Sequence, residues 1–335
     1  MAGYRPFGRN PTIRPMKRLF IIYNPMSSRF ADVKREVLDQ VKTLKGYLVG
    51  KYEVEKTDVD QNAKKFAKLL QDGDTVISAG GDATGVIAVN AILQSSKDVL
   101  LAVLPFGNFN DLSRTLGTKK FTDIISAISQ PAHSKTPDNH KDQPSPAQHQ
   151  TFFPLEIYVN DKFFRYATCY VTIGMTAEAV KLYDQPKMRK VLKTASGRNV
   201  GSYTNLASWY FKNRHKKQFL PDFRLNGVLQ PKKTSDYAAV NGRYMARVMR
   251  GGEEYKRPHI FRSQTDRLTS FWRLFKLMFR SIFFQIPGRE TKRDVLELLT
   301  PATIEIQAEG EYKSFDNVKK IEIRKSDKCL KMIKV

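Results

Sequence analysis

The stretch that decides the fold runs from Thr75 to Asn90 and reads TVISAGGDATGVIAVN. A short apolar segment ends in Gly80-Gly81, and an apolar run with helical spacing follows Asp82. Two glycines let the backbone turn sharply and approach a ligand, and the free N–H groups at a helix start suit phosphate. The stretch therefore predicts a strand, a glycine loop and a helix that can hold phosphate. A tight turn in which Asp82 or Thr84 caps the helix explains the same residues.

The same alternation continues on both sides of this stretch. Apolar runs typical of buried strands occupy Leu19–Tyr23, Tyr47–Val54 and Val99–Leu104. Segments with helical spacing lie at 33–44, 60–70, 83–93 and 121–128. A β-α-β-α series of this kind predicts an α/β fold with a doubly wound parallel sheet.

The residue composition changes after residue 150. Aromatic and β-branched residues dominate 154–159, 161–166 and 167–173, with Asn160-Asp161 as a hairpin signal. Further strands are predicted at 302–308, 319–324 and 329–335, and a long basic helical region at 182–217. We therefore expect a second, β-rich domain.

These patterns give a predicted domain organisation. A flexible linker or surface loop is expected where prolines and histidines replace apolar residues. The predicted segments are a basic N-terminal extension (1–17), an α/β domain (18–129), the linker (130–150), a β-rich domain with a basic amphipathic helix (151–325) and a C-terminal strand (326–335). A return of that last strand to the first domain is left open.

Charge and composition limit the function classes. Among 335 residues, 57 are Lys or Arg and 33 are Asp or Glu, so the net charge is +24. Such an excess implies an acidic partner: anionic lipid, nucleic acid or a phosphorylated substrate. Only Cys169 and Cys329 occur, which excludes a disulfide framework and a cysteine-built zinc site. No segment has the roughly 18 apolar residues of a membrane span, and no signal peptide is evident, so we expect a cytoplasmic protein.

Two more polar loops follow predicted strands. Leu101–Gly117 reads LAVLPFGNFNDLSRTLG, and Asn24–Arg29 reads NPMSSR. Because ligands of parallel sheets bind at the carboxyl ends of the strands, the three loops predict one nucleotide site. Asp82 is then a candidate for holding Mg²⁺ against nucleotide phosphates, directly or through water. Each loop is also explained as a capped turn.

The loops resemble the diacylglycerol kinase catalytic domain, and most closely the bacterial soluble lipid kinases. Asn24-Pro25 stands at the NP motif of that family, Gly80–Thr84 (GGDAT) at its GGDGT, and Pro105–Asp111 (PFGNFND) at its P-x-G-T-x-N-D. A weaker likeness covers Phe164–Ala179, and Ala308–Glu311 (AEGE) stands where the family has D-G-E.

The resemblance implies an ATP- and Mg²⁺-dependent kinase that phosphorylates a hydroxyl of a membrane lipid such as diacylglycerol, with ATP between the two domains. It makes 18–129 the nucleotide-binding domain and 151–325 the lipid-substrate domain. It implies catalytic roles for Glu311, as the base, and for Asp82, which also meets the ATP-bound Mg²⁺. An exposed strand-end carboxylate explains Glu311 equally well. The implied nucleotide-binding residues are Asn24, Ser27, Thr57, Gly80, Gly81, Asp82, Ala83, Thr84, Gly85, Val86, Gly107, Asn108, Asn110 and Asp111.

Departures from the family pattern keep alternatives open. Ala83 replaces a glycine, Val86-Ile87 replaces an Asn-Glu pair, and Asn108 replaces a threonine. A nucleotide-binding member without catalysis and an NAD-kinase-like enzyme are therefore alternatives, although Asn110–Arg114 favours lipid kinases. The family's structural magnesium segment is not recognisable between Tyr237 and Asp266, so no structural metal ligands are predicted.

A basic amphipathic segment points to a membrane. Residues 267–286 read RLTSFWRLFKLMFRSIFFQI, with Arg273, Lys276 and Arg280 on one helical face. This is the pattern of a helix that lies in a lipid interface, with Trp272 entering the lipid. A helix buried against the second domain is the alternative. The expected partners are a lipid substrate and an anionic membrane surface, with peripheral association at its inner face.

A nucleic-acid-binding protein is the rival class. The charge and the basic run 213–217 near Tyr210 suggest it, but no recognisable nucleic-acid motif accompanies them. We therefore expect no nucleic acid as partner. The sequence gives no indication of the oligomeric state.

Overall fold

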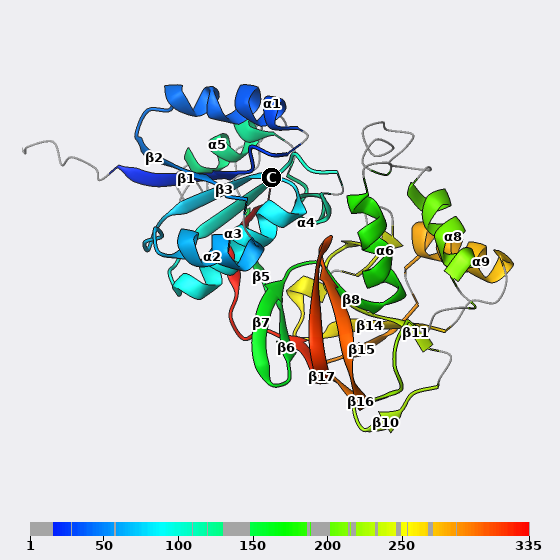
Figure 1. Cartoon of the computed structure of the whole chain (residues 1–335). Helices are drawn as coiled ribbons and strands as arrows, with labels where there is room; N and C mark the ends of the chain where they lie inside the picture. The colour runs from blue at the N-terminus through cyan, green and yellow to red at the C-terminus, as the bar shows by residue number, and fades with distance from the viewer. Residues whose placement is uncertain are drawn as a thin grey trace, which may run out of the picture.

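The computed structural model describes residues 16–334 with gaps, and its strands form two large sheets (Figure 1). The gaps are 28, 57, 109, 119, 130–147, 186–187, 189–201, 214, 216–218, 232–233, 246–248, 253, 267–270 and 286. The predicted N-terminal extension and most of the predicted linker lie outside the described residues. One sheet is largely parallel and the other antiparallel, so the predicted fold class is confirmed.

The first sheet, sheet A, has the strand order β2-β1-β3-β4-β18-β5. Its neighbours pair in parallel except β18 and β5, which are antiparallel. The strands are β1 (Lys17–Tyr23), β2 (Tyr47–Glu53), β3 (Thr75–Gly80), β4 (Leu100–Pro105), β5 (Gln148–Phe152) and β18 (Leu330–Lys334). The C-terminal strand thus lies beside β4. Strand β5 crosses the boundary expected at residue 150 and belongs to sheet A.

Helices cover both faces of sheet A (Figure 1). Alternate residues of β1 face opposite sides: Leu19 and Ile21 share a core with α1 and α5, whereas Ile22 shares one with α2 and α3. The bounds are α1 (Phe30–Val33), continued by the π-helical η1 (Lys34–Leu38) and 3₁₀-helical η2 (Gln40–Thr43), α2 (Val59–Ala67), α3 (Asp82–Ser95), α4 (Asp111–Leu116) and α5 (Phe121–Ser129). The sheet is therefore doubly wound, as predicted.

The second sheet, sheet B, has the order β15-β14-β11-β8-β16-β17-β6-β7, with β9 paired to β16 and β10 to β9. The strands are β6 (Leu155–Val159), β7 (Lys162–Ala167), β8 (Tyr170–Gly174), β9 (Phe223–Leu225), β10 (Val228–Leu229), β11 (Thr234–Val240), β14 (Ile260–Asp266), β15 (Arg289–Thr291), β16 (Arg293–Ala308) and β17 (Glu311–Lys325). Asn160 and Asp161 have positive φ, +49° and +63°, so the predicted hairpin turn is present. Two short strands, β12 (Tyr244–Met245) and β13 (Met249–Arg250), pair separately.

Helices attached to sheet B differ from the prediction at one place. The expected basic helix over 182–217 corresponds to two described helices, α6 (Met175–Asp184) and α8 (Ser202–Asn213). Helix α6 begins directly after β8, before the predicted start. Beyond these lie η4 (Glu254–Lys256) and α9 (Phe271–Phe283). None of the helices in the described part of the chain is long and apolar enough to cross a bilayer.

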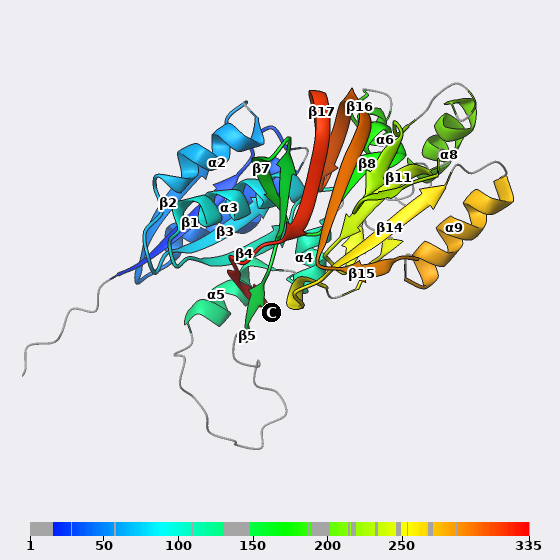
Figure 2. The ribbon, with the colours of Figure 1, turned by 90° about the horizontal axis from the view of Figure 1, so that it is seen from below.

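Buried polar contacts join the two sheets. The fully buried amide of Asn90, on α3, donates to the carbonyl of Tyr166 on β7 at 2.9 Å and accepts from its N–H at 2.9 Å. Close by, the Asp60 carboxylate on α2 pairs with Arg165 of β7 at 3.0 Å. Figure 2 shows β7 beside α2 and α3. This contact brings sheet B against the end of sheet A where the polar loops lie.

Candidate active site

Two glycine loops of sheet A touch each other. Gly81 precedes α3, and Gly107 follows β4. A Cβ atom added to Gly107 would lie 2.4 Å from the Cα of Gly81, and one added to Gly81 would lie 3.1 Å from the Cα of Gly107. A side chain on Gly107 would therefore push the loops apart. The glycines are needed for this mutual approach of the two backbones.

Asp82 joins these loops. Its half-buried carboxylate accepts the N–H groups of Asn110 at 2.9 Å and Asp111 at 2.8 Å, which begin α4. Asn110 adopts φ +59°, and its side chain exchanges hydrogen bonds with the backbone of Gly107 at 2.7 and 2.9 Å. Burial raises the pKa of Asp82, while the backbone N–H groups oppose the shift. Asp82 thus caps the next helix along the chain, not its own.

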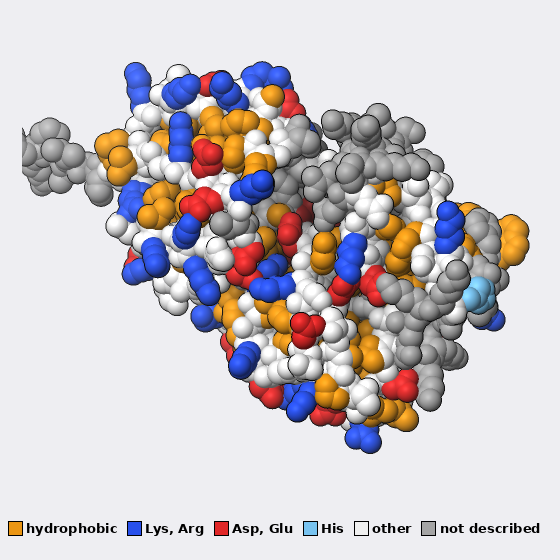
Figure 3. Space-filling view, viewed as in Figure 1, with side chains coloured by type: hydrophobic (Ala, Val, Ile, Leu, Met, Phe, Trp, Pro, Cys, Tyr) orange, Lys and Arg blue, Asp and Glu red, His pale blue; other side chains and the backbone are white. Residues whose placement is uncertain are grey.

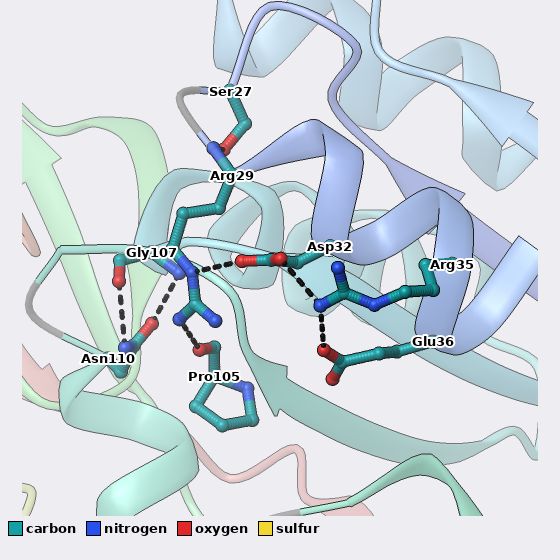
Figure 4. A network of polar contacts seen from close by, with 8 residues as sticks. All are labelled: Ser27, Arg29, Asp32, Arg35, Glu36, Pro105, Gly107 and Asn110. Carbon is teal, nitrogen blue, oxygen red and sulfur yellow. Dashed lines mark hydrogen bonds and ion pairs between the residues drawn. The ribbon is translucent and has the colours of Figure 1, made fainter.

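The loop after β1 is attached to the loop after β4 (Figure 4). The Arg29 guanidinium donates to the carbonyl of Pro105 at 2.9 Å and to Asp32 at 3.0 Å. It also lies over the ring of Phe106, 5.4 Å from the centroid. Within the first loop, the Arg29 N–H donates to Ser27 Oγ at 3.4 Å. The three polar loops predicted to form one site are therefore adjacent.

A tight turn of sheet B faces these loops. Glu309 and Gly310, both with positive φ, connect β16 to β17. The buried Glu309 carboxylate accepts from the backbone N–H and hydroxyl of Thr168 and from the N–H of Cys169. Burial raises the pKa of Glu309 to about 7, and the Asp82 charge adds to the shift. Glu309 therefore holds the turn in place, and Glu311 follows it.

A cleft of about 270 Å³ lies between the loops and the turn. Its walls combine loops of sheet A with the start of β17, and acidic and basic side chains gather where the two sheets meet (Figure 3). The lining residues are Asn24, Met26, Val54, Glu55, Asp58, Val59, Ala83, Thr84, Ile87, Arg165, Glu311, Tyr312 and Lys313. Of the predicted site residues, the cleft brings together Asn24, Ala83, Thr84 and Glu311.

The N-terminal part of the chain is similar in sequence to known proteins. Residues 18–138 match the family model of the diacylglycerol kinase catalytic domain. The diacylglycerol kinase of Staphylococcus saprophyticus subsp. saprophyticus is 36% identical over 114 residues, which span 33% of this chain and 36% of that protein. That of Staphylococcus carnosus is 34% identical over 114 residues, again 33% and 36%. The matched part is thus about a third of each relative. The predicted resemblance is confirmed.

Solved structures extend the likeness in fold. A diacylglycerol kinase from Bacillus anthracis str. Sterne superposes with a TM-score of 0.57 at 14% identity, covering 96% of this chain and 97% of that one. A putative diacylglycerol kinase from the same organism gives 0.59 at 16% identity, with the same coverage. Both sheets therefore follow a known diacylglycerol kinase fold. Glu311 lies outside the matched 18–138, so its place in the site rests on the geometry of the cleft.

Several predicted residues do not line the cleft. Ser27, Gly107, Asn108, Asn110 and Asp111 lie in or directly after the adjoining loops, and the buried Gly80 ends β3. Thr57 lies outside the described residues. Gly85 and Val86 lie on the core side of α3: a Cβ on Gly85 would face Leu112 and Val103, and Val86 is fully buried in the core. Neither residue lines the cleft.

Sequence reasoning missed two cations in the cleft, Arg165 and Lys313. Both pair with Asp60, at 3.0 and 3.2 Å. The Arg165 side chain is only 5% exposed, and its Nε has no hydrogen-bond partner in the described part of the chain. Arg165 lies in the segment 164–179 that resembles the kinase family, and Lys313 lies two residues after Glu311. In the sequence, their nearness to these two motifs was the signal that could have identified Arg165 and Lys313.

Proposed function

We propose that the protein is an ATP- and Mg²⁺-dependent kinase that transfers the γ-phosphoryl group to a hydroxyl of a membrane lipid such as diacylglycerol, at the inner face of a membrane. The family match and the relatives support a lipid kinase. The observation that carries the finer proposal is the cleft, in which the start of α3 faces two cations and the Glu311 carboxylate across the two sheets.

The cleft fits a nucleotide triphosphate. The N-terminus of α3, at Ala83 and Thr84, offers backbone N–H groups and the positive end of the helix dipole. Arg165 and Lys313 add cationic groups from sheet B. The Nε of Arg165 is a hydrogen-bond donor that has no partner in the described part of the chain. These groups would bind and orient the phosphates.

Magnesium would be held mainly by the phosphates and water. Among the described residues, no group of three His, Cys, Asp or Glu side chains could hold a metal ion by itself. This fits Mg²⁺, which commonly uses one or two carboxylates together with substrate phosphates. Our candidate is Asp82, which lies next to the cleft residue Ala83. Its carboxylate oxygens also accept the N–H groups of Asn110 and Asp111, so Asp82 would contact the ion through remaining lone pairs or through water. When bound, Mg²⁺ would neutralise charge on the phosphates.

Glu311 is suited to act as the base. A lipid hydroxyl is a weak nucleophile, so a positioned carboxylate assists by accepting its proton while the oxygen forms a bond to the γ-phosphorus. The bond between that phosphorus and the bridging oxygen breaks, and ADP leaves. The Oε1 atom of Glu309 accepts three hydrogen bonds from Thr168 and Cys169, so we assign Glu309 to positioning the turn and Glu311 to the substrate.

The test is transfer of label from γ-labelled ATP to a panel of acceptors in mixed micelles: diacylglycerol, a sphingoid base, a polyprenol and NAD. We expect label in a lipid, and Glu311→Gln should lower kcat about 10²–10⁴-fold without changing the melting temperature. Glu297→Gln, an exposed carboxylate on β16, is the matched control and should retain full activity. Label in NAD alone, or ATP binding without transfer to any acceptor, would contradict the proposal.

A further inference from the structure

Helix α9 carries an exposed row of aromatic side chains, which we call the aromatic stripe: Trp272, Phe275, Phe279 and Phe283. Their exposed fractions are 74%, 49%, 47% and 57%. Successive rings contact each other, with centroids 6.0, 6.2 and 4.6 Å apart. Figure 3 shows hydrophobic side chains exposed at the right-hand edge of the molecule, over α9. Contiguous exposed apolar surface of this kind marks an interaction site.

A second row, the basic stripe, runs beside the aromatic one. It consists of Arg273, Lys276 and Arg280, all exposed. Helical geometry places these residues about a quarter of a turn around α9 from the aromatic stripe. No Asp or Glu occurs in Phe271–Phe283. The exposed side of α9 is therefore half aromatic and half cationic, and the four side chains of the aromatic stripe are not buried against the second domain.

The combination of an aromatic and a basic stripe favours one kind of binding partner for α9 over another. A second copy of α9 would bring cations against cations, on a chain whose net charge is already +24. An anionic lipid surface meets both stripes at once, because Trp and Phe favour the boundary between headgroups and acyl chains while Arg and Lys contact the headgroups. Helix α9 has 13 residues, which suits a helix lying in the interface rather than one that spans it.

We propose that α9 is the membrane-docking element: it lies in the plane of an anionic bilayer, with the aromatic stripe in the headgroup–acyl boundary and the basic stripe on anionic headgroups. This deepens the proposed function, because it names the surface that brings a lipid kinase to its substrate. Helix α9 connects β14 to β15, at the edge of sheet B opposite β7 and Arg165 (Figure 2). Docking is thus separated from the phosphate-binding cleft.

The first experiment is co-sedimentation of the full chain with vesicles of phosphatidylcholine, with and without phosphatidylglycerol. We expect binding to the anionic vesicles that weakens with salt. Trp272→Ala with Phe279→Ala, and Arg273→Gln with Lys276→Gln and Arg280→Gln, should each reduce binding about tenfold or more.

Matched control variants remove exposed apolar and cationic side chains from surface positions outside α9. Leu48→Ala with Leu69→Ala removes two side chains that are 59% and 45% exposed. Lys51→Gln with Lys64→Gln and Lys68→Gln removes three exposed cations. Both controls should bind vesicles as the parent protein does. Equal binding by the α9 variants and their controls would overturn the proposal.

Tryptophan fluorescence gives a second readout, since the chain has two tryptophans, Trp209 and Trp272. In a Trp209→Phe background, Trp272 is the reporter. Anionic vesicles should shift its emission to shorter wavelength, and lipids brominated near the headgroup should quench it. Emission that stays unchanged on vesicles that bind the protein would overturn the assignment of α9.

Activity separates this proposal from the kinase proposal. With a short-chain, water-soluble diacylglycerol, the α9 variants should turn over like the parent; with vesicle-embedded diacylglycerol, they should be slower by at least the loss in binding. Vesicle binding through α9 without phosphorylation of either substrate would reject the kinase while supporting the docking element. Loss of self-association in the variants, with vesicle binding intact, would identify a second copy as the occupant and reject the docking element.

Discussion

At the scale of single residues, the site depends on a backbone contact that allows no side chain. The first prediction concerns Gly107→Ala, whose Cβ would lie 2.4 Å from Gly81 and 2.9 Å from the Asn110 side-chain oxygen. We expect the free energy of unfolding to fall by about 1–3 kcal/mol, because the overpacked loops must separate. Urea denaturation measures this.

Gly85→Ala is the matched control for that change. It adds a methyl group on α3 at ordinary contact distance, 3.6 Å from Leu112, and alanine favours a helix. Its stability should equal or exceed that of the parent. Equal stability of Gly107→Ala and Gly85→Ala would contradict the loop contact.

Two buried carboxyl groups give a second prediction, on pH. Burial raises the pKa of Glu309 to about 7 from 4.5 and that of Asp236, bonded to Thr176, to about 7 from 3.8. Between those values the folded state binds protons that the unfolded state has released, so stability is highest below the unfolded pKa and falls as pH rises through 7.

We expect Glu309→Gln and Asp236→Asn each to reduce the loss of unfolding free energy between about pH 5 and about pH 8 by about 2–3 kcal/mol. Urea melts at the two pH values give the difference. Glu297→Gln, at an exposed position, should leave the pH dependence as it is in the parent. Parallel pH profiles for all variants would show that these carboxyls ionise normally.

The sequence indicated the local residues of the site better than the distant ones. Among the residues that line the cleft, Asn24, Ala83 and Thr84 were predicted because each lies in or directly after a loop that follows an apolar strand. Arg165 and Lys313 were not found, since only the pairing of β7 and β17 within sheet B brings them to α3. Val86 was predicted from its position in the family motif, which tells which loop a residue follows and not which face of the helix it occupies; in the structure it lies in the core.

At the scale of elements, α3 is the link between the sheets, and the third prediction tests it. Asn90→Leu keeps the volume but leaves the N–H and C=O of Tyr166 unpaired in the core. Such a loss should cost about 2–4 kcal/mol of unfolding free energy. Gln61→Leu, on the exposed side of α2, is the control and should change stability little. Similar melting temperatures for both variants would show that the amide pair is dispensable.

Element lengths were predicted least well in sheet B. Strands β16 and β17 extend over 293–308 and 311–325, far beyond the predicted 302–308 and 319–324. Their outer residues are often charged, so apolar runs mark only part of each strand. The strands are continuous because they pair with each other along most of their length, and a sequence-local pattern does not contain that pairing.

At the scale of the whole molecule, sheet A joins strands that are far apart in the sequence. Strand β18 pairs with both β4 and β5, although it is the last strand in sequence order. Leu330, Met332 and Ile333 are at most 1% exposed, so they complete the core of sheet A. The sequence predicted a final strand but left its partner open, because a short apolar run fits an edge of either sheet.

The fourth prediction follows from this pairing of β18 with β4 and β5. Ile333→Ala should lower the free energy of unfolding by about 2–5 kcal/mol, a large part of what a typical domain has, whereas the exposed Lys334→Ala should change it by less than about 0.5 kcal/mol. Deletion of 329–335 should abolish the cooperative thermal transition followed by circular dichroism, since sheet A would lose its link between β4 and β5. A deletion variant that melts like the parent would mean that sheet A is stable without β18.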